Sequence, residues 1–246
     1  MPQSKVQGLC SRRIILNWRV NPDSLQKILP APFRPKLVEE NGIVGICIIE
    51  LEEMRPKGMP AFVGMRSINA APRIAVEWPD EDKPGQFEQG VYIPRRYTSA
   101  KWNAFVSKLR FFPTASGAGD IEVEEDEDGK IQAHAVAPDG MKLSFSGHTA
   151  DRLDDGSVFK TTQEASDFLK AAQVAYSPND VNEEFDAIKL KTYQWEAAAL
   201  SKNEAECTFI SDNFKGDEAN FDSALIMRGI AHEWHYLGCG SPCEFE

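Results

Sequence analysis

Residues 121–146, IEVEEDEDGKIQAHAVAPDGMKLSFS, alternate apolar and polar side chains in three short runs. Such a period of two is typical of a strand with one buried face. Asp128-Gly129 and Asp139-Gly140 separate the runs, and Asp-Gly pairs favour the tight turns of β-hairpins. The stretch therefore predicts a three-stranded antiparallel meander, with polar side chains such as His134 and Lys142 facing solvent.

Strand-like runs continue on both sides of this meander, interrupted by two short helices. Asn21 and Pro22 are typical of a helix start, and Thr161 to Glu164 form a capping-box pattern for a helix running towards Tyr176. There is no strand–helix–strand alternation. We therefore predict one domain over residues 1–246, mainly β in an α+β arrangement: a curled antiparallel sheet or β-barrel with two or three peripheral helices. The further strand-like runs are residues 11–20, 45–54, 67–78, 91–93, 188–195, 205–211 and 221–228.

Composition narrows the class of protein. The formal net charge of −11 argues against binding to nucleic acid or to an anionic membrane surface. Five cysteines without a CxxC pair indicate a reducing compartment, and no apolar run reaches the length of a signal core or a membrane span. We therefore expect a cytoplasmic protein. We expect no cofactor, and the sequence contains neither a Gly-rich phosphate loop nor the GxSxG motif of serine hydrolases. A homo-oligomer is left open.

A second informative stretch is GVYIPRRYTSAKWNAFVSKLRFFP, residues 90–113. Strand alternation places Val91, Ile93 and Arg95 on one side and Tyr92 and Arg96 on the other. If Val91 and Ile93 face the core, Arg95 also points inward. A buried guanidinium needs an anionic or hydrogen-bonding partner, which is either a protein carboxylate or a ligand. Apolar spacing predicts a helix after Thr98 or Ser99, with Trp102, Phe105, Val106 and Leu109 on its buried face.

Three blocks resemble the acetoacetate decarboxylase-like superfamily, in particular its DUF2071-type branch. They are VNPDSLQKILPAPF at residues 20–33, GVYIPRR at residues 90–96, and the segment from Asp222 to His235. The resemblance implies a barrel-like fold around an enclosed small-molecule cavity. In the decarboxylases it also implies a lysine that forms a Schiff base with a β-keto acid.

This sequence departs from the family at that lysine. The family's lysine position falls on Arg95, with Arg96 beside it, and an arginine stays protonated and is a very poor nucleophile. Lys101 and Lys142 are weak substitutes, because helix and strand patterns place both on solvent faces. The resemblance puts the family's glutamate near Asn69. It puts the family's substrate-facing arginine at Arg12 or Arg13, and the choice between these two stays open.

The leading hypothesis is an acetoacetate decarboxylase-like protein that holds a small carboxylate or keto compound, with lyase or enolate chemistry that does not use a Schiff base. A non-catalytic small-molecule-binding protein is the alternative. A metal-binding module is a second alternative, although the histidines of His232-Glu-Trp-His235 are one residue too close for HExxH. The candidate catalytic residues are Arg95 and His232; the candidate substrate-binding residues are Arg12, Arg13, Asn69, Tyr92, Arg96 and Arg228, with Arg73 as a further cavity charge; the candidate metal ligands are His232, His235, Cys239 and Cys243.

Overall fold

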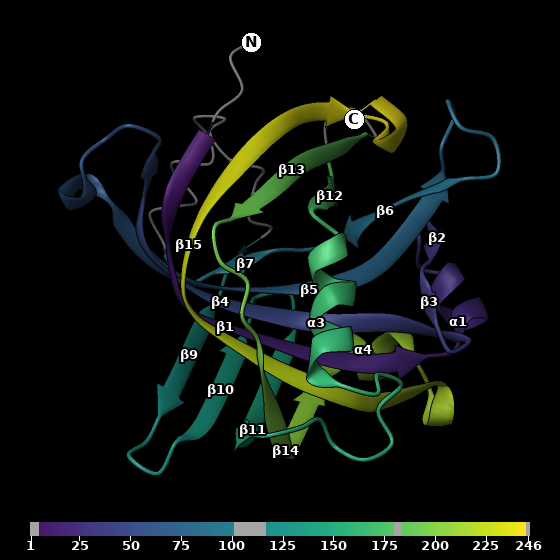
Figure 1. Ribbon diagram of the computed structural model, residues 1–246. Helices are drawn as coiled ribbons and strands as arrows, with labels where there is room; N and C mark the ends of the chain where they lie inside the picture. Colours follow the sequence, from purple (N-terminus) through teal and green to yellow (C-terminus); the bar gives the residue numbers. More distant parts are fainter. Residues whose placement is uncertain (1–4, 101–116, 180–183, 245–246) are drawn as a thin grey trace.

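The computed structural model describes residues 5–100, 117–179 and 184–244. Their strands form one curled sheet that closes on itself, because β15 pairs with both β13 and β1 (Figure 1). The closed ring consists, in order, of β1 (Lys5–Val20), β4 (Asn41–Pro56), β5 (Met65–Pro79), β6 (Phe87–Tyr92), β12 (Val174–Pro178), β13 (Phe185–Thr192) and β15 (Ala219–Gly240).

A four-stranded extension leaves the ring at β15. It contains the predicted meander, and its hairpins turn at the two Asp-Gly pairs as expected. This sheet, which is mostly antiparallel, confirms the predicted fold class. The extension is β14 (Ala198–Cys207), β11 (Lys142–Ala150), β10 (Lys130–Val136) and β9 (Asp120–Glu125); short strands are β2 (Arg34–Pro35), β3 (Leu37–Val38), β7 (Tyr97–Thr98) and β8 (Gly117–Ala118).

Both faces of the central strands are covered, so β1 carries apolar side chains on both sides. Ile14 and Leu16 belong to a core shared with the meander strands β9 to β11. Ile15 points the other way, into a second core beneath helix α3 (Thr162–Ala171), which lies across the sheet in Figure 1. The sheet therefore separates two layers, and a one-residue step along β1 moves a side chain from one layer to the other.

The described residues contain three α-helices: α1 (Pro22–Gln26), α3 and α4 (Thr208–Asn213). Asn21 caps α1 as predicted, because its Oδ1 accepts hydrogen bonds from the amides of Asp23 and Ser24. In α3 the Thr161 Oγ1 accepts from the Glu164 amide at 3.0 Å. The Glu164 carboxylate accepts from the amide of Lys160, one residue before the position that a capping box requires.

Two expected boundaries are wrong. The helix predicted to run towards Tyr176 ends at Ala171, and residues 174–178 form β12, which pairs in parallel with β6. Tyr176 is fully buried against Phe33 and Trp78, so tertiary packing overrides the local helical pattern. Residues 208–211, predicted as the end of a strand, belong to α4. The helix predicted around Trp102 to Leu109, and Lys101 with it, lies outside the described residues.

None of the helices in the described ranges is long and apolar enough to cross a membrane.

Candidate functional site: an arginine-lined cavity

The layer beneath α3 contains a cavity of about 860 Å³. Strands β1, β4 and β5 form one wall, β13 and β15 another, and the C-terminal end of α3 closes part of it. The described lining residues include no Asp or Glu, and all four lining lysines are exposed. The lining cations are Arg13, Arg73, Arg96, Lys5, Arg55, Lys57, Lys170 and Lys191.

Arg13 reaches the cavity from β1. Its Nε lies 3.2 Å from the Cys47 Sγ on β4, and its guanidinium lies over the Trp195 ring at 5.5 Å. Within the described residues Arg13 has no carboxylate partner at salt-bridge distance. Of the two candidate arginines of the first strand, Arg13 lines the cavity and Arg12 is not among its described lining residues.

Arg73 reaches the cavity from β5. It lies on β5 directly opposite Gly45 of β4 and is 5% exposed. Its Nη2 donates to the Asn17 Oδ1, and the Asn17 Nδ2 donates in turn to the Ser223 Oγ at 3.1 Å. Its Nε has no hydrogen-bond partner in the described part of the chain. Burial lowers the pKa of Arg73 to about 10, so the guanidinium remains charged at neutral pH.

Arg96 lines the cavity and Arg95 does not. The Arg96 Nε donates to the Ser177 Oγ at 3.0 Å, and burial lowers the pKa of Arg96 to about 10. The Arg95 side chain is 54% exposed and forms an ion pair with Asp139. The expectation that Arg95 points inward is therefore wrong. Strand β6 ends at Tyr92, and the chain bends at Pro94, so the period of two does not extend to the arginines.

The structure places two other candidates, Asn69 and Tyr92, in different surroundings. Asn69 lines the cavity, and its Nδ2 donates to the Ser67 Oγ at 2.9 Å. Tyr92 is buried in an aromatic cluster with Phe33 and Phe185, on the side of the sheet away from the cavity, and is not one of its lining residues. The prediction that Tyr92 contacts the substrate is therefore not matched by its position.

His232 lies near the cavity but is not one of its described lining residues. It is 3% exposed, its Nδ1 is 3.3 Å from the Ile230 carbonyl oxygen, and its ring centroid lies 5.4 Å from that of Trp234. Its Nε2 has no partner in the described structure. Burial lowers the pKa of His232, which favours a neutral imidazole. Its catalytic role remains a prediction.

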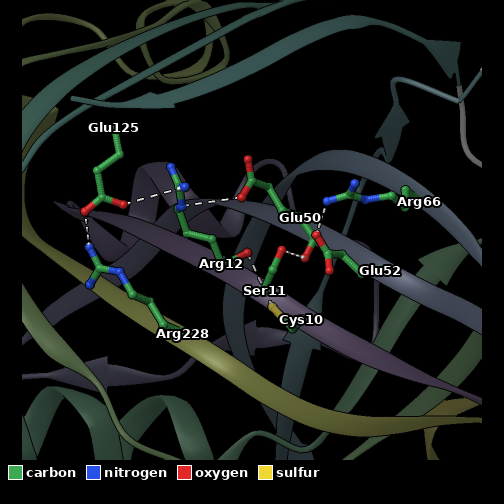
Figure 2. Close-up of polar contacts among 8 residues, drawn as sticks. All are labelled: Cys10, Ser11, Arg12, Glu50, Glu52, Arg66, Glu125 and Arg228. Carbon is green, nitrogen blue, oxygen red and sulfur yellow. Dashed lines mark hydrogen bonds and ion pairs between the residues drawn. The ribbon is translucent and has the colours of Figure 1, made fainter. Parts of the chain in front are cut away.

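Arg12 and Arg228 lie outside the cavity, in a network of ion pairs facing β9 (Figure 2). The Arg12 guanidinium lies 3.4 Å from Glu50 and 3.6 Å from Glu125, and Arg228 lies 2.7 Å from Glu125. Arg12 follows the alternation of Ile14 and so points away from Arg13. The structure does not bring these two candidate substrate-binding arginines to the cavity.

The four candidate metal ligands do not converge either. No group of three or more His, Cys, Asp or Glu side chains in the described ranges is arranged to hold a metal ion. The His235 Nε2 donates to the Glu233 carboxylate at 2.8 Å, and the Cys239 Sγ lies 3.2 Å from a Glu184 oxygen. His232 and His235 are three residues apart on β15, and an odd separation along a strand places two side chains on opposite faces.

A carboxylate at the cavity's edge ties three segments together. Glu233 on β15 accepts hydrogen bonds from Lys57 at 2.8 and 2.9 Å, and from Tyr193. With His235, these partners lower the pKa of Glu233 to about 2. Lys57 is thus an ion-pair partner and not a free amine.

Comparisons of the sequence and the structure with known proteins identify the fold of the chain. Residues 10–112 match the family model DUF2071, described as an uncharacterized conserved protein. Acetoacetate decarboxylase from Legionella pneumophila superposes with a TM-score of 0.61 at 14% identity, over 97% of this chain and 87% of that one. The chain has the acetoacetate decarboxylase-like fold. No curated protein matches the sequence significantly.

Two more acetoacetate decarboxylase-like structures are similar. An acetoacetate decarboxylase-like enzyme from Sphingomonas wittichii has a TM-score of 0.57 at 12% identity, covering 96% of this chain and 91% of that one. The enduracididine biosynthesis enzyme MppR, solved in complex with pyruvate, has a TM-score of 0.57 at 10% identity, covering 97% and 89%. At these identities the likeness establishes the fold alone.

Within this fold, sequence reasoning missed Cys47, Trp195 and Trp234 as cavity residues. Cys47 lies in the run GICIIELEEM, whose apolar residues do not alternate clearly because both faces of β4 are buried. The sequence did contain one indication of the cavity. Asn69, Ala71 and Arg73 share one face of a strand, and small and polar side chains on a buried face indicate space for a ligand.

Proposed function

We propose that this chain holds a small carboxylate or keto acid in the cavity, bound by the guanidinium groups of Arg13, Arg73 and Arg96. One observation carries the proposal: these arginines line a cavity whose described lining contains no acidic side chain. A ligand carboxylate would place a negative charge beside Arg13 and Arg73, which have no carboxylate at salt-bridge distance in the described ranges.

The physical argument rests on the cost of burying charge. An ionised group removed from water is unfavourable unless it is paired and hydrogen-bonded. Arg73 is almost completely buried, and its described side-chain partner is the neutral amide of Asn17. A bound carboxylate would compensate this charge with charge-assisted hydrogen bonds, which are about twice as strong as neutral ones.

The same groups favour chemistry on an enolate. A guanidinium fixed in a cavity of low polarity can stabilise an oxyanion that develops on a keto acid. The described cavity lysines are exposed at its edge, so an iminium is not the expected intermediate. The chain would thus bind a keto acid and stabilise its enolate by electrostatics, without covalent attachment to a lysine.

Pyruvate is the probe for this proposal, and binding is measured by calorimetry on the purified chain. Removing a charged hydrogen-bonding group costs roughly 1.5–3 kcal/mol, so Arg73→Gln should weaken binding by about 10- to 100-fold. Arg228→Gln is the matched control, because it removes an arginine that is outside the cavity. Equal affinities for the wild type and Arg73→Gln would overturn the proposal.

The same samples in D2O separate catalysis from binding. Enolate formation exchanges the methyl protons of pyruvate for deuterium, which proton NMR follows directly. We expect the wild type to accelerate this exchange and Arg73→Gln to lose the acceleration. Binding without any acceleration would leave the non-catalytic alternative as the function.

A further inference from the structure

The cavity contains a cysteine that the proposed binding function does not use. Cys47 lies on β4, is 6% exposed and lines the cavity. The Arg13 Nε lies 3.2 Å from its Sγ. Its cross-strand partner on β5 is Ala71, another lining residue, whose methyl group occupies little of the space beside the sulfur.

A second observation at this place points to a ligand. Arg73 lines the same cavity, is 5% exposed, and has no carboxylate partner in the described ranges. Arg96, which follows β6, also lines this cavity. An anion drawn into the cavity by these guanidinium groups would therefore lie close to the Cys47 sulfur.

We propose that Cys47 is a nucleophilic site for small electrophiles that carry a carboxylate. The inference rests on the anion site of the proposed function and adds a covalent step to it. Arginines hold the carboxylate and thereby place the electrophilic carbon next to sulfur. Positioning of this kind converts an encounter between two molecules into a reaction within one complex, which greatly raises its rate.

The step balances without any further reactant. The thiolate is the attacking form of cysteine, and the thiol proton passes to solvent. With an α-haloacid, the sulfur forms a bond to the α-carbon, the carbon–halogen bond breaks, and the halide leaves with the bonding pair. With an α,β-unsaturated carboxylate, sulfur bonds to the β-carbon, the π pair moves to the α-carbon, and that carbon takes a proton from solvent.

Another cysteine of the same chain provides the internal comparison. Cys239 is partly exposed, and its sulfur lies 3.2 Å from a carboxylate oxygen of Glu184. An anionic reagent is repelled there, whereas a neutral reagent is not. Cys47 and Cys239 should consequently prefer opposite members of a matched reagent pair.

The experiment compares iodoacetate with iodoacetamide, which differ in charge but react by the same displacement of iodide. Peptide mass mapping over time gives separate rate constants for Cys47 and Cys239. At Cys47 we expect iodoacetate to react faster than iodoacetamide by on the order of tenfold, because the cavity binds it first. At Cys239 the order should reverse. A Cys47 preference for iodoacetamide overturns the proposal.

Two variants identify the cause. Arg13→Gln and Arg73→Gln should each abolish the preference for iodoacetate at Cys47 while leaving both rates at Cys239 unchanged. A preference that survives both substitutions would overturn the role of the arginines. Cys47→Ser must lose the fast-reacting site, which confirms the assignment of the modified peptide.

Pyruvate separates this inference from the proposed function. If pyruvate binds and slows carboxymethylation of Cys47, both hold. If pyruvate binds in calorimetry but Cys47 shows no preference for iodoacetate, the nucleophilic role fails and the binding function stands. If pyruvate does not bind while the preference remains, the keto-acid function fails and the reactive cysteine stands.

Discussion

At the scale of the residue, Gly45 provides the space in which the Arg73 guanidinium lies. A methyl group at this position would be 2.5 Å from the Leu16 carbonyl oxygen, 3.0 Å from the Arg73 Nη2 and 3.1 Å from the Asn17 Oδ1. The side chains of Arg73 and Asn17 form a buried hydrogen bond with each other at this place. Glycine is therefore needed for close approach, and not for a turn.

We expect Gly45→Ala to lower the free energy of unfolding by roughly 1–3 kcal/mol, the usual cost of forcing extra volume into a packed site. It should also weaken pyruvate binding, because Arg73 must move. Urea denaturation and calorimetry measure the two effects. Gly117→Ala is the control, since a methyl group there meets nothing closer than 3.9 Å in the described structure. Wild-type stability and affinity in Gly45→Ala would contradict this account.

Two pairs of adjacent arginines show what the sequence can and cannot decide at this scale. Both pairs were recognised as candidates for cavity charge, and one member of each pair, Arg13 and Arg96, lines the cavity. The choice within Arg12 and Arg13 requires knowing which layer contains the cavity, because both faces of β1 are buried. The choice within Arg95 and Arg96 depends on the bend at Pro94, where strand alternation stops.

At the scale of the element, helix α3 begins at a cap that the sequence predicted and ends at the wall of the cavity. Leu169, Lys170 and Ala172, at its C-terminal end, line the cavity. The Thr161 cap was predictable from four residues of local sequence. The end of the helix was not, because it depends on the burial of Tyr176 against aromatic residues from other strands.

Removing the cap should destabilise this element. Thr161→Ala leaves the Glu164 amide without its acceptor, and we expect a loss of about 1 kcal/mol in the free energy of unfolding. Thr162→Ala, one residue further on, removes a threonine that makes no capping bond among the described contacts. Urea denaturation of both variants checks the difference. Equal stability of the two variants would show that the cap contributes little.

At the scale of the whole molecule, Glu233 joins the last strand of the ring to two other segments, through Lys57 after β4 and Tyr193 after β13. Its pKa is lowered from 4.5 to about 2 in the folded chain. A carboxyl group with a lowered pKa stabilises the fold when it is ionised. This contribution is complete above about pH 4.5 and is lost as the pH falls towards 2.

The melting temperature of the wild type should therefore exceed that of Glu233→Gln at neutral pH, and the difference should shrink as the pH falls from 4.5 towards 2. Glu122→Gln, which removes an exposed acid of β9, controls for the change in net charge. Thermal denaturation followed by circular dichroism across this pH range measures both. A difference that is independent of pH would rule out the ionised carboxylate as its source.

The sequence predicted a curled antiparallel sheet or a barrel, but not which strands would close it. Local alternation identifies several strands, such as the three of the meander, whereas the pairing of β1 with β15 joins segments that no local pattern connects. Asn17 and Ser223, which are hydrogen-bonded across this pairing, are 206 residues apart.

This closure has a consequence for the synthesis of the chain. A ribosome releases the N-terminal end first, so β1 emerges and can pair with β4 long before β15 exists. Until residues 219–240 are made, one edge of β1 remains open to strands of other chains, a known hazard for growing polypeptides. The exposed period ends when β15 pairs with β1. Contacts between residues so far apart in the sequence form slowly, which lengthens this period.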